Sequence, residues 1–346
     1  MIIQSINIFR YSIPIINQSY ARNQDNASGL LISVSIDGAN TGWGEISCID
    51  SRSSQSFNDF FWQIEEYKIS IENQDLSFDE LIGLVPIHIS SPNVRYGLEL
   101  AIYDLYSRSL SLPLSNFIKQ DAPDSIYTNG FYITDIDLSS FDLIKVKLLS
   151  NNSISESNRI RSIVSDCPGS RLRLDGNQIF DLPRAIRFVK ELEGLPIDYI
   201  EQLTPANNVD DISELRLHTD IKIAVDESVD SISSAQEIID NSAADVFVIK
   251  PSQFGGISDL LEVVSLANQN NIEVVITHAF ETAIGRMGNV HLALSLTSQP
   301  CGFGMGKYLK NDFGLDGIST NSRLQIKKTI GHGIVPSKKV LDTIEV

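Results

Sequence analysis

The stretch Leu172-Arg173-Leu174-Asp175-Gly176-Asn177 is an apolar, strand-like run that ends in polar residues. Four other stretches have the same form. They are Ile144-Lys145-Val146-Lys147-Leu148, Tyr199-Ile200-Glu201, Ile223-Ala224-Val225-Asp226-Glu227 and Phe247-Val248-Ile249-Lys250-Pro251. From Lys147 to Lys250 the charged residues follow one another at steps of 28, 26, 25 and 24 residues, the length of a strand, a loop and a helix. This rhythm predicts a (β/α)8 barrel with functional groups at the C-terminal ends of successive strands.

The N-terminal third of the chain has a different pattern. Strands are predicted over residues 2–8, 30–36 and 42–47, and helices over residues 57–67 and 93–110. Asp37-Gly38 supplies a turn between the last two strands. Strands followed by helices indicate an α+β domain.

The chain therefore divides into three parts. We expect an α+β capping domain over residues 1–120, a (β/α) barrel catalytic domain over residues 121–315, and a C-terminal tail over residues 316–346 that packs back on the capping domain. Within the barrel, helices are predicted over residues 155–164, 182–192, 210–218, 233–241, 257–270 and 282–296.

Composition excludes several classes of function. The net charge of -17 disfavours binding to nucleic acid or to an anionic membrane, because such contacts come from clustered Lys and Arg. No apolar run approaches the ~18 residues of a membrane helix, and the segment from Met1 to Pro14 carries Arg10 and lacks a cleavage site. The three cysteines are widely spaced, so neither disulfides nor a zinc site is indicated. We expect a cytoplasmic protein with a small-molecule partner, and the number of subunits stays open.

Three acids lie on consecutive predicted strand ends. Asp175, Glu201 and Asp226 are hard oxygen donors that suit Mg²⁺ if they converge. Each acid taken alone is better explained as a helix cap or as the partner of a surface Lys, but the regular spacing favours a shared site. Asn177 lies two residues after Asp175, so we expect it to face the same side and to bind nearby ligands.

Lys145, Lys147 and Lys250 lie inside apolar strand runs. Lys145 and Lys147 share one face of their strand, and Lys250 follows four strands later, on the opposite wall of an eight-stranded ring. The alternative is that the lysines only neutralise the acids. A lysine that faces a metal-bound carboxylate substrate can remove its α-proton, because the metal stabilises the resulting enediolate.

These residues resemble the enolase superfamily, in its muconate lactonizing enzyme subgroup. The likeness includes Lys145-Val146-Lys147, Asp175-Gly176-Asn177, Glu201, Asp226-Glu227 and Lys250-Pro251. The resemblance implies that the three acids bind Mg²⁺, with Mn²⁺ as the alternative, and that Lys147 faces Lys250 across the substrate. It also implies an N-terminal capping domain whose mobile loop corresponds to residues 18–28 and contains Arg22.

Within the subgroup, the stretch from Ile276 to Gly285 is most similar to the o-succinylbenzoate synthases of menaquinone biosynthesis, with Thr277-His278 where that family has serines. This implies a dehydratase, a carbon-oxygen lyase. The alternatives are a cycloisomerase, a dipeptide epimerase, an N-acylamino acid racemase and a metal-binding barrel without catalysis. Dipeptide epimerases carry an Asp-x-Asp pair on the eighth strand, where this chain has Cys301-Gly302-Phe303-Gly304-Met305.

In the synthase reading Lys147 is the base, and it returns its proton to the departing hydroxyl. Lys250 stays charged and stabilises the enediolate, while Lys145 holds Lys147 in place and lowers its pKa. Substrate contacts or supporting roles are assigned to Asn177, Glu227, His278, Glu281 and Arg22. His278 either contacts substrate, orients Glu281 or caps the following helix. Trp43 and Trp62 are expected to be packed in the core or between domains.

Overall fold

The computed structural model describes residues 1–16, 25–36, 40–48, 57–132, 138–278, 281–303, 309–310, 312–313, 322–326, 329–337 and 341. Arg22 and the turn expected at Asp37-Gly38 lie outside these residues. Among the described helices, none combines the length and the apolar content that crossing a bilayer requires.

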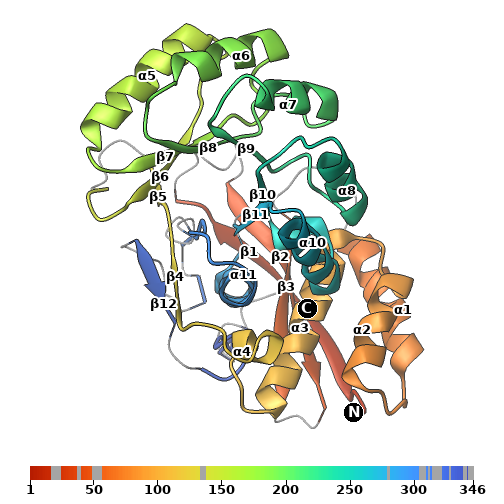
Figure 1. Cartoon of the computed structure of the whole chain (residues 1–346). Helices are drawn as coiled ribbons and strands as arrows, with labels where there is room; N and C mark the ends of the chain where they lie inside the picture. Colours follow the sequence, from red (N-terminus) through yellow and green to blue (C-terminus); the bar gives the residue numbers. More distant parts are fainter. Residues whose placement is uncertain are drawn as a thin grey trace.

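The chain opens with an antiparallel three-stranded sheet in the order β1-β2-β3 (Figure 1). Its strands are β1 (Ser5–Pro14), β2 (Asn26–Ser35) and β3 (Thr41–Ser47), followed by α1 (Phe57–Ile71), α2 (Phe78–His88) and α3 (Pro92–Ser109). The sequence patterns do not predict α2, which begins with a capping box between Ser77 and Glu80. Trp43 is buried as expected, but Trp62 is 72% exposed on α1, so its predicted burial is wrong.

The second part is a curled parallel sheet of seven strands, with helices on its outer side (Figure 1). Its strands are β5 (Gly130–Phe131), β6 (Leu143–Lys147), β7 (Arg171–Asp175), β8 (Ile197–Glu201), β9 (Lys222–Val225), β10 (Val246–Ile249) and β11 (Glu273–Ile276). In the described part, the residues at the place of the eighth strand form two isolated β-bridges, Thr128 with Cys301 and Thr277 with Gly302. The α/β barrel with an N-terminal cap is therefore confirmed, and among the described residues the eighth position makes these two bridges.

The barrel helices alternate with the strands. They are α5 (Ser153–Asp166), α6 (Leu182–Glu191), α7 (Val209–Arg216), α8 (Ile232–Asp240), α9 (Pro251–Phe254), α10 (Ile257–Gln269) and α11 (Ala283–Leu296). Apart from the short α9, these helices lie within two residues of their predicted bounds. Before the barrel, α4 (Leu114–Ile118) leads to β4 (Ser125–Tyr127), which pairs with β12 (Arg323–Gln325).

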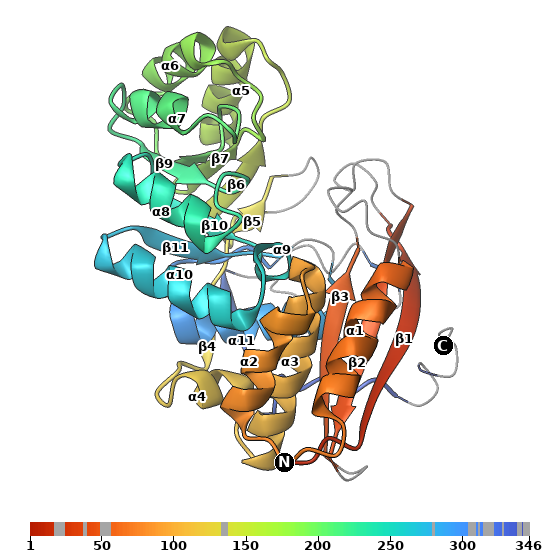
Figure 2. The ribbon, with the colours of Figure 1, turned by 90° about the vertical axis from the view of Figure 1, so that its right-hand side faces the viewer.

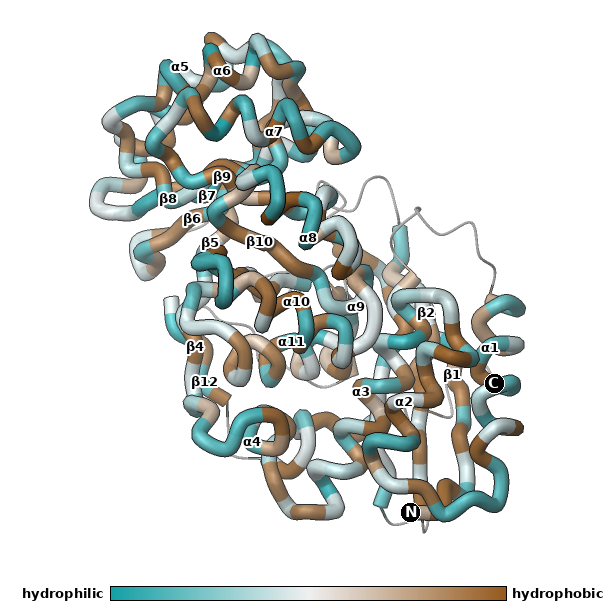
Figure 3. Tube along the Cα trace, turned by 45° about the vertical axis from the view of Figure 1, so that its right-hand side comes forward, coloured by the Kyte–Doolittle hydropathy of each residue, from teal (hydrophilic) through white to brown (hydrophobic). Residues whose placement is uncertain are grey.

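Buried apolar side chains of neighbouring strands pack together in the barrel. Strand β10 is apolar along its length (Figure 3). One buried cluster consists of Tyr199, Ala224, Val246, Val248 and Val275. The guanidinium of Arg173 lies over the Tyr199 ring, 4.6 Å from its centroid, and binds Asp198 and the Pro300 carbonyl. This packing closes the lower interior, so polar groups at the C-terminal strand ends can face one common space.

The N-terminal domain contacts the C-terminal ends of β10 and β11. Helix α3 touches both β3 and α9, and thus joins the two parts (Figure 2). Glu99 on α3 accepts the N–H of Ser258, and Glu45 on β3 accepts the N–H of Thr282. The N-terminal domain thus contacts the barrel at the end where the charged residues lie.

Residues near the C-terminus also contact α3. The N–H of His332 donates to Asp104 at 2.8 Å, and Arg108 donates to the Ile334 carbonyl at 3.0 Å. His332 also contacts the Trp43 carbonyl at 3.0 Å. These buried polar contacts bring residues 332–334 to the N-terminal domain.

Candidate active site

Strand β6 presents its two lysines on one face. Val146 and Leu148 point to the other face and are buried, as period-two geometry predicts. The end of the strand is fixed by α5, because Arg159 donates to the Lys147 carbonyl at 2.7 Å. The backbone of Lys147 is therefore held by a side chain of α5, a helix on the outer side of the sheet.

Strands β7 and β8 place two acids side by side. Asp175 is paired in register with both Lys147 and Glu201. Lys145 Nζ lies 2.8 Å from both carboxylate oxygens of Glu201 and 3.0 Å from Asp175 Oδ2. Lys145 thus bridges the two acids, a contact of the kind that the alternative of acid-neutralising lysines predicts.

Asp226 and Lys250 follow the last residues of β9 and β10, and their side chains form an ion pair. The backbone at Asp226 is fixed by Gln202, whose Oε1 accepts the N–H groups of Asp226 at 3.1 Å and Ser228 at 3.2 Å. Gln202 is buried and has a left-handed φ of 42°. The residue directly after Glu201 therefore positions the next acid.

The charges of this cluster perturb one another. Burial raises the pKa of Glu201 to about 8, and the neighbouring charge of Asp175 adds to this effect. Burial also acts on Asp175, but the charges of Lys145, Lys250 and Lys147 outweigh it and lower its pKa. Burial tends to lower the pKa of Lys250, yet the charge of Asp226 raises it above the ordinary value. All three lysines are therefore close enough to stabilise the Asp175 carboxylate.

The donor set suits a hard divalent cation. Besides the three acids, Asn177 Oδ1 and Glu227 Oε2 are buried oxygens without a hydrogen-bond partner in the described part of the chain. Such orphaned acceptors call for a cation or a donor that binds there. As they stand, no three acidic, His or Cys side chains in the described residues converge as a metal site requires. In this structure the Lys145 and Lys250 ammonium groups bind the acids, and the assignment of Asp175, Glu201 and Asp226 to a metal stays a prediction.

The remaining predicted residues form two pairs, Asn177 with Glu227 next to the acids and His278 with Glu281 after β11. Asn177 Nδ2 donates to Glu227 Oε1 at 3.3 Å, so Glu227 turns towards the acids rather than away from them. His278 is buried, with Nδ1 3.5 Å from Glu281 Oε2, and its ring stacks on Phe303. Glu281 is fully buried and accepts the hydroxyl of Ser252.

Sequence reasoning missed three supporting residues. Arg159, Gln202 and Ser252 hold backbone or side chains next to the predicted site. Gln202 and Ser252 each lie within two residues of a predicted site residue, and this proximity was the one available signal. Arg159 lies in a helix, where nothing in the local pattern distinguishes it from a solvent-exposed charge.

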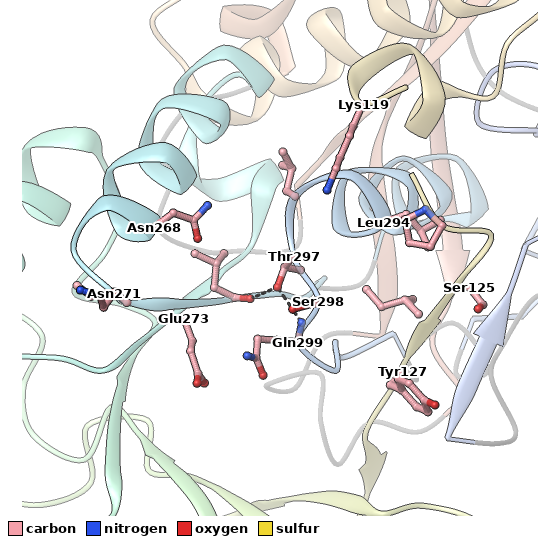
Figure 4. Close-up of a pocket in the computed structure, with 15 residues that line it drawn as sticks. Lys119, Ser125, Tyr127, Asn268, Asn271, Glu273, Leu294, Thr297, Ser298 and Gln299 are labelled. Carbon is pink, nitrogen blue, oxygen red and sulfur yellow. Dashed lines mark hydrogen bonds between the residues drawn. The ribbon is translucent and has the colours of Figure 1, made fainter. Parts of the chain in front are cut away.

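A separate open groove of about 690 Å³ lies at the other end of the barrel (Figure 4). Its lining includes Ser125 and Glu273 at the starts of β4 and β11, and Thr297 after α11. The Thr297 hydroxyl donates to the Val274 carbonyl at 2.6 Å. This groove contains none of the predicted site residues.

Comparisons with known proteins give relatives of several activities. The family model described as enolase C-terminal domain-like matches residues 134–340. An o-succinylbenzoate synthase of Thermobifida fusca is 31% identical over 57% of this chain and 59% of that protein. A chloromuconate cycloisomerase of Pseudomonas sp. is 29% identical over 61% of this chain and 60% of that protein. The chain thus spans about three fifths of the length of these two relatives.

A longer match is found with an L-Ala-D/L-Glu epimerase of Clostridium acetobutylicum, which is 25% identical over 85% of this chain and 87% of that protein. Among solved structures, the muconate lactonizing enzyme of Pseudomonas putida superposes with a TM-score of 0.88 at 19% identity and covers both chains completely. The structural match establishes the fold.

Proposed function

Because the chain belongs to the enolase C-terminal domain-like family, we propose that it is a dehydratase of the o-succinylbenzoate synthase type. The observation that carries the proposal is the placement of Lys147 and Lys250. They lie at the ends of β6 and β10, four strands apart in a curled sheet, and both lower the pKa of Asp175 between them. Two lysine side chains on either side of an acidic cluster suit a small carboxylate substrate, one acting as a neutral amine base and the other as a fixed ammonium group.

Asp175, Glu201 and Asp226 would hold the Mg²⁺ of such a reaction, with Mn²⁺ as a substitute. When bound, the cation supplies positive charge for the substrate carboxylate and makes the neighbouring proton more acidic. Binding it requires Lys145 and Lys250 to give up their contacts with the acids. Asn177 and Glu227 support the acids through their mutual hydrogen bond.

Lys147 removes the proton α to the substrate carboxylate and takes it up as an ammonium proton. The same group then returns this proton to the departing hydroxyl as the carbon-oxygen bond breaks, so that water leaves from the face that lost the proton. Lys250 remains protonated and stabilises the negative charge that develops on the substrate.

An epimerase or racemase acting on a dipeptide or an N-acylamino acid is the second candidate. The long match to the Clostridium acetobutylicum epimerase favours it, and two lysines can serve as a base on each face. The stretch Cys301-Gly302-Phe303-Gly304-Met305 lacks the acidic pair that a dipeptide amino group requires. A cycloisomerase is supported by the Pseudomonas sp. relative.

Direct assays separate these candidates. The purified protein is given Mg²⁺ and, in parallel, the cyclohexadiene substrate of o-succinylbenzoate synthases, L-Ala-L-Glu, an N-acylamino acid and muconate. We expect formation of the aromatic product at a kcat/KM above about 10⁴ M⁻¹s⁻¹, in the usual range of enzymes. Efficient epimerisation or cycloisomerisation without dehydration would overturn the proposal in favour of the corresponding alternative.

A further inference from the structure

A buried chain of hydrogen bonds connects the N-terminal domain to the segment that begins at Lys250. Glu45 on β3 accepts the N–H of Thr282 at 2.8 Å, its hydroxyl at 2.5 Å, and the N–H of Gly285 at 2.8 Å. Glu281, the residue before Thr282, accepts the Ser252 hydroxyl at 2.6 Å. Ser252 lies in α9, two residues after Lys250.

The two acidic side chains in this chain pack against the same glycine. A Cβ atom at Gly285 would lie 2.9 Å from both Glu281 Cβ and Glu45 Oε2, so only glycine leaves room for this arrangement. Both acids are fully buried, and placing like charges near each other in the interior costs free energy. The hydrogen bonds to Thr282, Gly285 and Ser252 offset this cost, and they hold the two carboxylates in one geometry.

Glu99 on α3 anchors the other end of the segment that begins at Lys250. Glu99 accepts the N–H of Ser258 at 3.0 Å and its hydroxyl at 3.2 Å. A Cβ at Gly256 would lie 2.1 Å from Glu99 Oε1, so a larger residue here would displace the Glu99 carboxyl group. Residues 250–258 are therefore held at both ends by carboxylates that come from other parts of the fold.

We propose that Glu45, Glu281 and Ser252 are positioning residues that fix Lys250 relative to the N-terminal domain. In the structure, the Lys250 ammonium is also held by Asp226. When Asp226 binds a cation, that ion pair is given up, and the backbone anchored through Ser252 then determines where the ammonium lies. This inference rests on the proposed function for the role of Lys250 in catalysis, but the anchoring itself does not depend on it.

The test compares Ser252→Ala with Ser295→Ala as a matched control. Ser295 is a buried serine on α11 whose hydroxyl donates to the carbonyls of Ser115 and His291, away from Lys250. Deuterium uptake of residues 250–258 is measured by mass spectrometry in the full-length protein. We expect faster uptake in Ser252→Ala than in Ser295→Ala, and equal uptake in both variants would overturn the anchoring.

The kinetic arm uses Glu281. Glu281→Ala should lower kcat on the order of tenfold to a hundredfold with little change in KM, because a displaced catalytic group costs rate more than binding. Glu281→Gln keeps an oxygen that accepts the Ser252 hydroxyl, so it should restore most of kcat and the slow uptake of residues 250–258. Equal losses in Glu281→Gln and Glu281→Ala would overturn the positioning role. If the unaltered protein does not dehydrate the substrate, the proposed function fails, and the uptake experiment still decides on the anchoring.

Discussion

Lys145 Nζ lies 2.8 Å from both carboxylate oxygens of Glu201. The same ammonium group contacts Asp175, so it occupies the place between two acids that we assign to a divalent cation. Removing one partner of a buried ion pair costs about 3–5 kcal/mol, since the remaining charge is left uncompensated. Lys145 therefore stabilises the metal-free protein and competes with the metal for the same oxygens.

Replacing this lysine should separate the two effects. We expect Lys145→Met to unfold at a lower temperature than the unaltered protein without metal, and to bind Mg²⁺ more tightly. Mg²⁺ should then raise its unfolding temperature by a larger amount, because binding to the folded state stabilises it. Calorimetry and thermal unfolding with and without Mg²⁺ measure both quantities.

Lys222→Met is the matched control for this experiment. It removes a lysine from the ion pair with Glu273, in which both side chains are substantially exposed. Such surface pairs contribute roughly 0–1 kcal/mol, so neither stability nor Mg²⁺ affinity should change much. Unchanged Mg²⁺ affinity in Lys145→Met would contradict the assignment of Asp175 and Glu201 to the metal.

The acids themselves provide the second prediction. Glu201→Gln should weaken Mg²⁺ binding at least tenfold, since it replaces a charged oxygen donor with a neutral one. Excess chelator should abolish the activity of the unaltered protein, and added Mg²⁺ should restore it. The exposed Glu237 on α8 serves as control, because Glu237→Gln should leave Mg²⁺ affinity unchanged. Full activity in excess chelator would exclude the metal-dependent mechanism.

The sequence predicted the barrel well because its signals are local. Strands β6 to β10 each place a charged residue at or directly after their ends, and the apolar periods of the helices indicate their bounds closely. Helix α2 was not predicted because Gly83 and Pro86 interrupt its helical apolar pattern. Trp62 was misjudged because it directly follows Phe60 and Phe61. Successive helical residues point in different directions, so Phe60 is buried and Trp62 is not.

The site could be predicted only to the extent that strand spacing and the two-residue period of a strand fix which side chains lie at the same end and on the same face. The positions of Asp175, Glu201 and Asp226 at neighbouring strand ends follow from spacing, but the partner of each side chain does not. Lys145 shares its strand face with Lys147, yet no sequence pattern predicts the rotamer that brings its ammonium group to Glu201. Contacts such as Glu45 with Thr282 join residues 237 positions apart, and no local signal marks them.

A third prediction concerns stability and pH at the contact between the domains. Burial raises the pKa of Glu99 to about 7, from an ordinary value of 4.5. Because the folded state holds this proton more tightly, the stability associated with Glu99 is complete below pH 4.5 and is lost as pH rises to about 7. The difference corresponds to roughly 3 kcal/mol. Glu99→Gln is neutral at every pH and retains an oxygen for Ser258.

Thermal unfolding of both proteins from pH 5 to pH 8 tests this prediction. The unfolding temperature of Glu99→Gln relative to the unaltered protein should rise across this range. Arg95 and Asp259 lie close to Glu99 and are present in both proteins, so the comparison isolates the Glu99 carboxyl group. A constant difference between the two unfolding temperatures would show that Glu99 is already ionised at pH 5.

The last prediction separates Lys147 from Lys250, and with them dehydration from epimerisation. In a syn elimination one group removes the α-proton and protonates the leaving hydroxyl, whereas a two-base epimerase needs an acid-base group on each face. Lys147→Ala should therefore abolish both dehydration and the exchange of the α-proton with solvent. Lys250→Ala should also cripple dehydration, because the developing negative charge loses a nearby cation, a loss on the order of a few kcal/mol.

Lys250→Arg distinguishes charge from proton transfer, since the guanidinium keeps its charge and does not readily deprotonate. The Lys250 side chain has 20% of its surface exposed, which leaves some space for the larger group. Measurable dehydration by Lys250→Arg with none by Lys250→Ala would support one base and one fixed cation. If Lys250→Arg were as inactive as Lys250→Ala while a substrate analogue still bound, proton transfer by Lys250 would be required. That result would favour the epimerase hypothesis. If Lys250→Gln and Lys147→Ala both kept full activity, neither lysine would act in catalysis, and the dehydratase proposal would have to be abandoned.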